Sequence, residues 1–385
     1  MTDSDDTPHL AVLVSFSGYG GVERMILNLI HGFVAQGVAV DLLAIRAPAA
    51  AWREELPPSV RLVDLGVRHS LLALPALIGY LRKHRPPALL AAKDRAIRLA
   101  VLARRAAGVD TRLVGRLGTH LSTALVDKHP VQRWLRCRPM RWLYPQVDCI
   151  VAVSEGVAED AMHLAGLTTE RILVVRNPVV TPRMLALAQE PVSHPWFNDD
   201  GPPIILGAGR LTRQKDFPTL LRAFAALQKQ RPARLAILGE GRQRHTLLAQ
   251  ATHLGIADCV DLPGFVANPY AYMAKAAVFA LSSLWEGSPN VLTEALALGT
   301  PVVATDCPSG PREILDGGRY GPLVAVGDAA ALAQGLAEML AHPPAADKLQ
   351  AAVTDYTLQA STQGYLDALK WNEYAAREST HAVIS

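Results

Sequence analysis

Two glutamates, Glu286 and Glu294, stand eight positions apart around a Gly-Ser-Pro-Asn turn in the stretch "LWEGSPNVLTEALALGT". Ser288 followed by Pro289 is the order expected of an N-cap residue and the first residue of a helix. The first amides of that helix and its dipole favour an anion such as a phosphate. Two carboxylates beside an anion are tolerable if they bind hydroxyls, which sugars and ribose supply. The residues expected to line this site are Gly287, Ser288, Asn290, Val291 and Leu292.

Two cations accompany the glutamates in the second half of the chain. Arg210 and Lys215 stand five residues apart in "GAGRLTRQKDF", directly after a buried apolar run. Cations at the carboxyl end of a strand can neutralise a diphosphate on which charge develops as it leaves. Taken singly, each is equally consistent with a solvated surface loop. Together with the turn before Asn290, they indicate a diphosphate site.

A glycine-rich turn follows the first apolar run, in "SFSGYGGVERMILNLIHGF". Gly18, Gly20 and Gly21 would let backbone amides approach a ligand at the start of the next helix. The spacing is GxGG and not the full dinucleotide fingerprint GxGxxG. A tight strand-to-helix turn without a ligand is therefore the alternative interpretation.

Apolar runs of five to seven residues alternate with longer helical segments along almost the whole chain. Most runs are continuous, as in strands that are buried on both faces of a parallel sheet. The rhythm breaks in the proline-rich residues 178–203, which we interpret as a connection between domains. The sequence therefore predicts an α/β protein with two doubly wound, Rossmann-like domains and a ligand site between them.

The composition is that of a globular protein of 385 residues with 50% hydrophobic residues. The acidic start "MTDSDDTPHL" is unlike a signal peptide, and no stretch is long and apolar enough to span a membrane. Four scattered cysteines suggest neither a zinc site nor a disulfide framework. We therefore expect a cytoplasmic protein.

Positive charge is concentrated between Arg82 and Arg141, where 15 Lys or Arg face three acids. Within residues 82–144, "RWLRCRPMRWLY" interleaves Arg with Trp, Leu and Met, which is typical of a helix on an anionic membrane surface. Two alternatives are a solvated basic helix whose Trp134 and Trp142 pack inward, and nucleic-acid binding. No nucleic-acid partner is predicted, because no recognised binding fold accompanies the charge.

Several of these motifs occur in a fixed order. "GGVERM", "AVSEGVAEDAM", "GRLTRQKDF", "LGEGRQRHTL" and the E-x7-E motif "EGSPNVLTE" together resemble the retaining, nucleotide-sugar-dependent glycosyltransferases of family 4, which have the GT-B fold. The resemblance runs from about residue 10 to the C-terminus. It implies an N-terminal acceptor-side domain at 1–180, a donor-binding domain at 181–362 and a C-terminal helix, 363–385, that returns to the first domain.

The resemblance also implies roles for individual residues. Glu294 would bind the ribose of the donor nucleotide, and Glu286 would bind hydroxyls of the transferred sugar. Arg210 and Lys215 would hold the diphosphate as leaving group, together with the turn at Gly20 and Gly21. The remaining assignments are His120 facing the donor sugar, Gly264 and Phe265 contacting the base, and Asp94, with its neighbours Lys93 and Arg95, contacting the acceptor.

For the reaction, the resemblance implies a hexosyltransferase that retains the anomeric configuration. The leaving diphosphate would itself accept the proton of the acceptor hydroxyl, and no cofactor or metal is expected. The one DxD motif, Asp3-Ser4-Asp5, lies in the polar N-terminal stretch.

The stretch "DCPSGPREIL" resembles a subgroup of these enzymes that act on polysaccharide or lipid-linked oligosaccharide precursors. Together with the basic stretch, it favours a polyprenyl-diphosphate-linked acceptor and a place at the inner face of a bacterial plasma membrane. Separately, we expect the donor to be a UDP-sugar rather than a GDP-sugar. Two alternatives are a nucleotide-sugar 2-epimerase of the same fold and a non-catalytic nucleotide-sugar-binding subunit.

Overall fold

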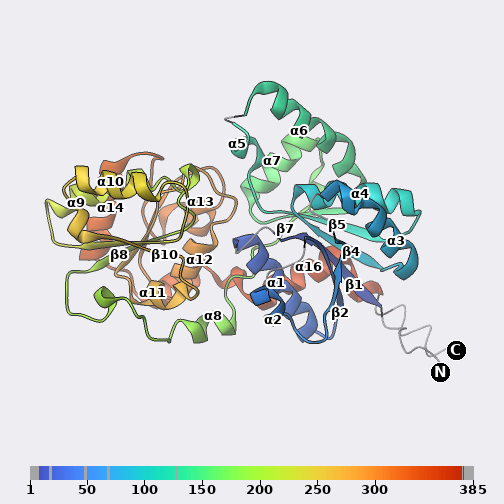
Figure 1. Ribbon diagram of the computed structural model, residues 1–385, viewed down its shortest axis with the longest axis horizontal. Coiled ribbons are helices and arrows are strands. Elements are labelled where there is room, and N and C mark those ends of the chain that lie inside the picture. The colour runs from blue at the N-terminus through green and yellow to red at the C-terminus, as the bar shows by residue number, and fades with distance from the viewer. Residues whose placement is uncertain are drawn as a thin grey trace. The chain divides into compact units, whose positions relative to one another are not determined.

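The computed structural model describes residues 8–16, 20–46, 50–66, 70–126, 128–374 and 376. The chain divides into two compact units (Figure 1). Unit 1 holds Met1–Pro178 and Leu358–Ser385, and unit 2 holds Val179–Thr357. Each unit contains one parallel sheet covered by helices, so the predicted pair of α/β domains is confirmed.

The sheet of unit 1 has seven strands in the order β3-β2-β1-β4-β5-β6-β7. The five residues of its central strand β4, "ALLAA", are all buried, as the continuous apolar run predicts. Because the strands are parallel, their carboxyl ends meet at one edge of the sheet. The strands are β1 (His9–Ser15), β2 (Ala39–Arg46), β3 (Arg61–Asp64), β4 (Ala88–Ala92), β5 (Arg112–Leu117), β6 (Cys149–Ala152) and β7 (Ile172–Val174).

Helices cover both faces of this sheet (Figure 1). One face packs against α3, α4 and α7, and the other against α1, α2 and the C-terminal helix α16. The helices of unit 1 are α1 (Gly21–Ala35), α2 (Ala50–Glu54), α3 (Leu74–His84), α4 (Asp94–Ala107), α5 (Leu121–Ala124), α6 (Pro130–Leu143), α7 (Glu155–Ala165) and α16 (Leu358–Leu369).

The C-terminal helix α16 closes unit 1 by packing on α1. Tyr365 and Leu369 are buried in the same core as Phe33 of α1. The returning segment was expected at 363–385. The observed helix begins five residues earlier at Leu358, and the residues after 376 lie outside the described ones.

The sheet of unit 2 has six strands in the order β10-β9-β8-β11-β12-β13. Its strands are β8 (Ile204–Ala208), β9 (Arg234–Leu238), β10 (Val260–Gly264), β11 (Val278–Leu281), β12 (Val302–Thr305) and β13 (Leu323–Val324). Its helices are α8 (Pro182–Leu187), α9 (Phe217–Gln228), α10 (Arg244–His253), α11 (Pro269–Lys275), α12 (Asn290–Ala297), α13 (Pro311–Ile314), α14 (Ala329–Ala341) and α15 (Ala346–Ala351).

The interpretation of residues 178–203 as an interdomain connection is wrong. Unit 2 begins at Val179, and this segment packs on it. His194 lies with its Nε2 2.7 Å from an Oδ of Asp261, and the ring of Phe197 packs edge-on against Tyr272 at 5.0 Å. The prolines therefore mark helix starts and turns within unit 2, because proline fits the first turn of a helix.

Candidate active site

The centre of the site in unit 2 is an ion pair between Lys215 and Glu286. Lys215 Nζ donates to Glu286 Oε1 at 2.6 Å, and the Ser283 hydroxyl donates to the same oxygen at 2.7 Å. Lys215 follows β8 and Glu286 follows β11, two neighbouring strands of the sheet. The exposed fractions of the two side chains are 15% and 9%. The fold therefore joins two residues that the sequence analysis had placed on different parts of the donor.

Residues that the sequence analysis missed hold Lys215 in place. Ser282 donates from its hydroxyl to the Lys215 carbonyl at 2.7 Å. Gly209 has φ +149°, and a Cβ there would lie 2.8 Å from Lys215 Cε. A glycine at this position leaves room for the lysine side chain to pass. The glycine is visible in "GAGRL", but its contact with Lys215 could not be inferred without the fold.

The turn after Glu286 differs in detail from the prediction. Helix α12 begins at Asn290 with Pro289 as N-cap, so Ser288 is not the cap. The Leu292 amide donates to the Pro289 carbonyl at 3.0 Å and is therefore unavailable to a ligand, contrary to expectation. The Ser288 hydroxyl oxygen is buried and has no hydrogen-bond partner among the described residues. It is a polar group beside the helix start that a ligand can satisfy.

The "DCPSGPREIL" segment packs against this turn. Ser309 donates from its hydroxyl to the Gly287 carbonyl at 2.7 Å. Gly310 has φ +91°, and a Cβ there would lie 2.6 Å from Cδ of Pro289. Within α12, Glu294 is 8% exposed. The two glutamates of the motif are thus both buried, Glu286 before this turn and Glu294 in the helix that follows it.

The other predicted residues of unit 2 lie at the same carboxyl edge. Arg210 follows β8; it is exposed and pairs with no carboxylate in the described part of the chain. Gly264 ends β10 with φ +88°, and its carbonyl accepts from the Gly239 amide at 2.7 Å. Phe265 directly after it is 62% exposed.

In unit 1 the glycine turn leads into α1. Gly20 is the N-cap of α1 and Gly21 its first residue, whereas Gly18 lies outside the described residues. Glu23, in the first turn of α1, is buried, and its Oε1 accepts from Lys93 Nζ at 2.6 Å. Neither residue of this ion pair was singled out together with the glycines in the sequence analysis.

His120 and Asp94 have local partners in unit 1. His120 is the N-cap of α5, and its Nδ1 lies 2.9 Å from the Thr123 hydroxyl and 3.7 Å from Asp160 Oδ2. Asp94 starts α4 and accepts from Arg98 Nε at 2.8 Å and from the Tyr144 hydroxyl at 2.7 Å. The Asp94 carboxylate is thus engaged in contacts that join α4 to the segment after α6.

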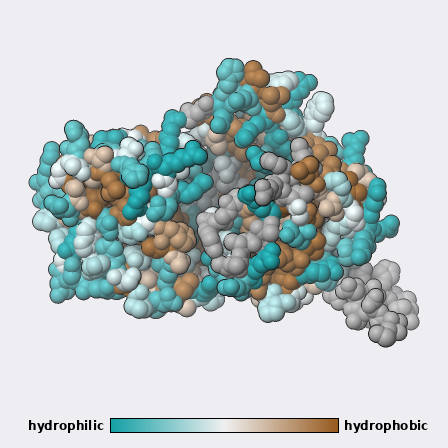
Figure 2. Space-filling view, viewed as in Figure 1, coloured by the Kyte–Doolittle hydropathy of each residue, from teal (hydrophilic) through white to brown (hydrophobic). Residues whose placement is uncertain are grey.

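Helix α6 carries the basic, tryptophan-bearing stretch. The interpretation that its tryptophans pack inward is wrong: Trp134 is 54% exposed and Trp142 is 69% exposed. The Arg138 guanidinium lies over both rings, at 4.7 and 5.9 Å from their centroids. Figure 2 shows both hydrophobic and hydrophilic surface at the top of the view, where Figure 1 places this helix.

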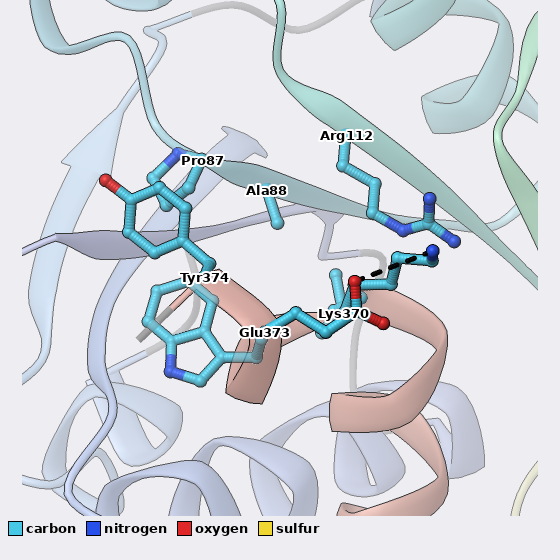
Figure 3. A pocket seen from close by; sticks show the side chains of 8 residues that line it. Pro87, Ala88, Arg112, Lys370, Glu373 and Tyr374 are labelled. Carbon is cyan, nitrogen blue, oxygen red and sulfur yellow. Dashed lines mark ion pairs between the residues drawn. The ribbon is translucent and has the colours of Figure 1, made fainter. Parts of the chain in front are cut away.

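A cavity of about 210 Å³ lies in unit 1, at the amino edge of its sheet (Figure 3). Ala88 and Arg112, at the amino ends of β4 and β5, line it with the chain after α16. Its charged groups already have partners. Arg112 Nε donates to the Ala368 carbonyl at 2.9 Å, and Lys370 pairs with Glu373 at 3.6 Å.

In the described part of the chain, no three His, Cys, Asp or Glu side chains come together so that they could hold a metal ion. Asp3-Ser4-Asp5 lies outside that part. No helix among the described residues is both long and apolar enough to cross a membrane.

Two family profiles match the chain in succession. Residues 19–183 match the profile described as Glycosyltransferase Family 4, and residues 202–342 match that of Glycosyl transferases group 1. The chain belongs to glycosyltransferase family 4. Its two parallel-sheet domains are those of the GT-B fold, as predicted.

Two relatives of this glycosyltransferase are similar over different lengths. It is 37% identical over 210 residues to an N-acetylgalactosamine-N,N'-diacetylbacillosaminyl-diphospho-undecaprenol 4-alpha-N-acetylgalactosaminyltransferase of Campylobacter jejuni, a match that spans 54% of each chain. It is 28% identical over 364 residues to the lipopolysaccharide core biosynthesis glycosyltransferase LpsE of Rhizobium meliloti, which covers 92% of this chain and 97% of the relative.

Solved structures show the same fold at low sequence identity. The apo form of the lipopolysaccharide outer core galactosyltransferase WaaB superposes with a TM-score of 0.71 at 21% identity, covering 94% of this chain and 99% of that one. Anabaena Alr3699/HepE in complex with UDP and glucose superposes with a TM-score of 0.75 at 18% identity, with the same coverage.

Proposed function

We propose that this glycosyltransferase moves a hexose from a UDP-sugar to an acceptor hydroxyl with retention of the anomeric configuration. The observation that carries the proposal is the Lys215–Glu286 pair beside the start of α12, where the Ser288 hydroxyl lacks a partner. A cation, a helix start and an unsatisfied hydroxyl together suit a diphosphate. The neighbouring carboxylates suit sugar and ribose hydroxyls. UDP is favoured over GDP because UDP is bound by structural neighbours such as HepE.

In this proposal the donor contacts follow the positions of the side chains. Glu294 binds the ribose hydroxyls, Glu286 binds a sugar hydroxyl, and Arg210 and Lys215 neutralise the diphosphate. The exposed ring of Phe265 stacks on the base beside Gly264. The remaining proposed contacts are those of Gly287, Ser288, Asn290 and Val291 with phosphate or sugar, of Gly20 and Gly21 with the diphosphate, and of His120 with the sugar.

The chemical step is a substitution on one face of the sugar. The bond from the anomeric carbon to the diphosphate oxygen breaks, and the acceptor oxygen forms its bond to that carbon on the same side. The acceptor proton passes to the leaving diphosphate. Lys215 and Arg210 stabilise the charge that develops on the diphosphate, so we propose that no metal is required.

Calorimetric titration in the presence of EDTA tests the donor assignment. UDP is expected to bind with micromolar affinity and GDP much more weakly. UDP-hexoses then follow with a saccharide acceptor, and the anomeric configuration of the product is read by NMR. Inversion at the anomeric carbon would contradict the mechanism, and binding that requires added metal would contradict metal independence.

We propose a lipid-linked saccharide as the acceptor, in the assembly of lipopolysaccharide or another cell-surface polysaccharide. The support is the name of the Campylobacter relative, whose acceptor is linked to diphospho-undecaprenol, and that of LpsE in core biosynthesis. Free nucleotide-sugar epimerisation without acceptor would favour the epimerase alternative. Donor binding without turnover on any lipid-linked acceptor would favour a non-catalytic subunit.

We also propose that α6 places the enzyme on the inner, anionic face of the plasma membrane. Helix α6 carries four arginines and no acidic residue, and Val131, Trp134, Leu135 and Trp142 are all exposed on it. Exposed tryptophans between arginines are typical of interfacial helices. The charge of the helix complements anionic lipid rather than a neutral surface.

Liposome flotation tests this membrane contact. The full chain is expected to float with vesicles containing anionic phospholipid and to remain at the bottom with neutral vesicles. The double variant Trp134→Ala/Trp142→Ala should lose flotation. Leu248→Ala, which removes an exposed leucine of α10, is the matched control and should float like the wild type. The proposal would be contradicted if the wild type floated equally with neutral and anionic vesicles, or if the double variant floated with anionic vesicles as well as the wild type does.

A further inference from the structure

Both units carry a Lys–Glu ion pair at the same topological place. In unit 2 the pair joins the loops after β8 and β11, the two strands between which the strand order reverses. In unit 1 the order reverses between β1 and β4, and there Lys93 follows β4 while Glu23 follows β1. The Nζ–Oε1 distance is 2.6 Å in each pair. Such switch points are where doubly wound sheets bind ligands.

The pair in unit 1 connects the two ends of the glycine turn. Lys93 Nζ donates to the Ser15 carbonyl at the end of β1 at 3.2 Å, and to Glu23 Oε1 in the first turn of α1. The exposed fractions are 31% for Lys93 and 3% for Glu23. One ammonium group thus fixes both the strand that leads into the turn and the helix that leaves it.

Two local features show that this arrangement is constrained. Lys93 has φ +77°, a value uncommon for a residue with a side chain. A Cβ on Gly20 would lie 2.5 Å from the other carboxylate oxygen of Glu23, Oε2. The Glu23 carboxylate therefore occupies the space that a side chain at position 20 would need. Gly20, Glu23 and Lys93 form one interlocked unit.

We infer that Lys93 and Glu23 are positioning residues, which hold the Gly20–Gly21 turn in the geometry that the reaction requires. The inference rests on the proposed function, in which this turn contacts the donor diphosphate. Neither residue touches the reacting atoms in this account. Their effect is on the backbone of the turn, so it differs from that of Lys215, which acts on the diphosphate itself.

Lys93→Met tests this inference, because methionine keeps much of the length of lysine and removes its charge. Turnover is expected to fall about tenfold to a hundredfold, as it does when reacting groups are misplaced, and UDP affinity is expected to fall less than turnover, because the other proposed donor contacts, in unit 2, are unchanged. The double variant Lys93→Met/Glu23→Gln leaves no unpaired buried charge, so its thermal stability should return towards wild type while turnover stays low. Gly79→Ala, at an exposed site of α3 with no atom within 4 Å of the added Cβ, is the control.

A mutant cycle separates positioning from a general loss of stability. Gly20→Ala displaces the Glu23 carboxylate, so combining it with Lys93→Met should cost no more turnover than the worse single variant. Two results would overturn the inference. One is additive losses of turnover when Gly20→Ala and Lys93→Met are combined, and the other is recovery of turnover together with stability in Lys93→Met/Glu23→Gln.

Hydrogen exchange gives a readout that is independent of catalysis. Lys93→Met should speed exchange of the amides in the first turn of α1, and Gly79→Ala should leave them unchanged. If the wild type binds no nucleotide and transfers no sugar, the proposed function fails, but the exchange result still tests whether Lys93 and Glu23 hold the Gly20–Gly21 turn. If the wild type is active and Lys93→Met matches it in exchange and turnover, only the positioning role of Lys93 and Glu23 is wrong.

Discussion

The two ion pairs at the switch points use the same residue types for different purposes. In unit 2, Glu286 also accepts from Ser283, and the chain after it forms a turn with the buried Ser288 hydroxyl. In unit 1, Glu23 lies inside a helix whose N-cap is Gly20 and whose first residue is Gly21. In the proposed donor site, side chains would therefore supply the polar groups in unit 2, whereas backbone amides would supply them in unit 1. A shared topology fixes where a site forms but not which atoms make it.

The largest effect should come from breaking the pair in unit 2. Lys215→Met is expected to reduce turnover roughly 100- to 1,000-fold, because a cation that stabilises the leaving diphosphate is lost. That loss should exceed the loss in Lys93→Met. Steady-state kinetics at saturating donor measures both. Similar losses in the two variants would mean that both pairs act in the same way.

Asp41, a buried carboxylate of unit 1 outside both ion pairs, should affect the free energy of unfolding and leave turnover unchanged. Asp41 in β2 is fully buried. Burial alone would raise the pKa of Asp41, but hydrogen bonds from Arg61, Tyr80 and His9 outweigh it and hold the pKa below its ordinary value. Asp41→Asn should lower the free energy of unfolding by about 3 kcal/mol at neutral pH, as removal of one buried partner does.

The pH dependence of that difference follows from the direction of the shift. A carboxylate with a depressed pKa in the folded state stabilises the protein above the pKa of the unfolded state and loses this effect as pH falls through the folded value. The gap between wild type and Asp41→Asn should therefore be constant near neutrality and shrink below about pH 4. Chemical denaturation of both proteins at several pH values measures this difference in the free energy of unfolding. A difference that widens on acidification would contradict the lowered pKa of Asp41.

The smallest of these effects is expected at Glu294. Glu294→Ala should weaken UDP binding by roughly 1 to 3 kcal/mol, the cost of hydrogen bonds to a pair of ribose hydroxyls. Calorimetry with UDP and with 2'-deoxy-UDP measures it. The variant should bind the two ligands alike, whereas the wild type should prefer UDP. An unchanged preference in the variant would remove the ribose assignment.

Strands and motifs were readable from the sequence for a simple reason. Continuous apolar runs such as "ALLAA" are buried on both faces wherever they lie in a parallel sheet, so each run identified a strand. The residues of the E-x7-E motif and of the GxGG motif are close together in the chain, so both motifs can be recognised without knowing the fold. The helix start was misplaced by one residue: Pro289 has extended dihedrals (φ −73°, ψ 96°) and is the N-cap, and residue preferences alone locate a helix end only to within one or two residues.

Contacts between distant residues were not readable. Glu23 and Lys93 are 70 residues apart, and Lys215 and Glu286 are 71 residues apart. Each pair depends on which strands become neighbours. The exposure of Trp134 and Trp142 was equally undetermined, since a helix with tryptophan and arginine on one side can pack in either direction.

The sequence by itself determined the alternation of strands and helices, the ordered motifs of the family and the charge of α6, because these depend on residues close together in the chain. Tertiary structure alone decided that each unit joins a lysine and a glutamate at its switch point. Strand order brings those loops to one edge, and the two residues of each pair stand 70 or 71 positions apart in the chain, beyond the reach of any local pattern.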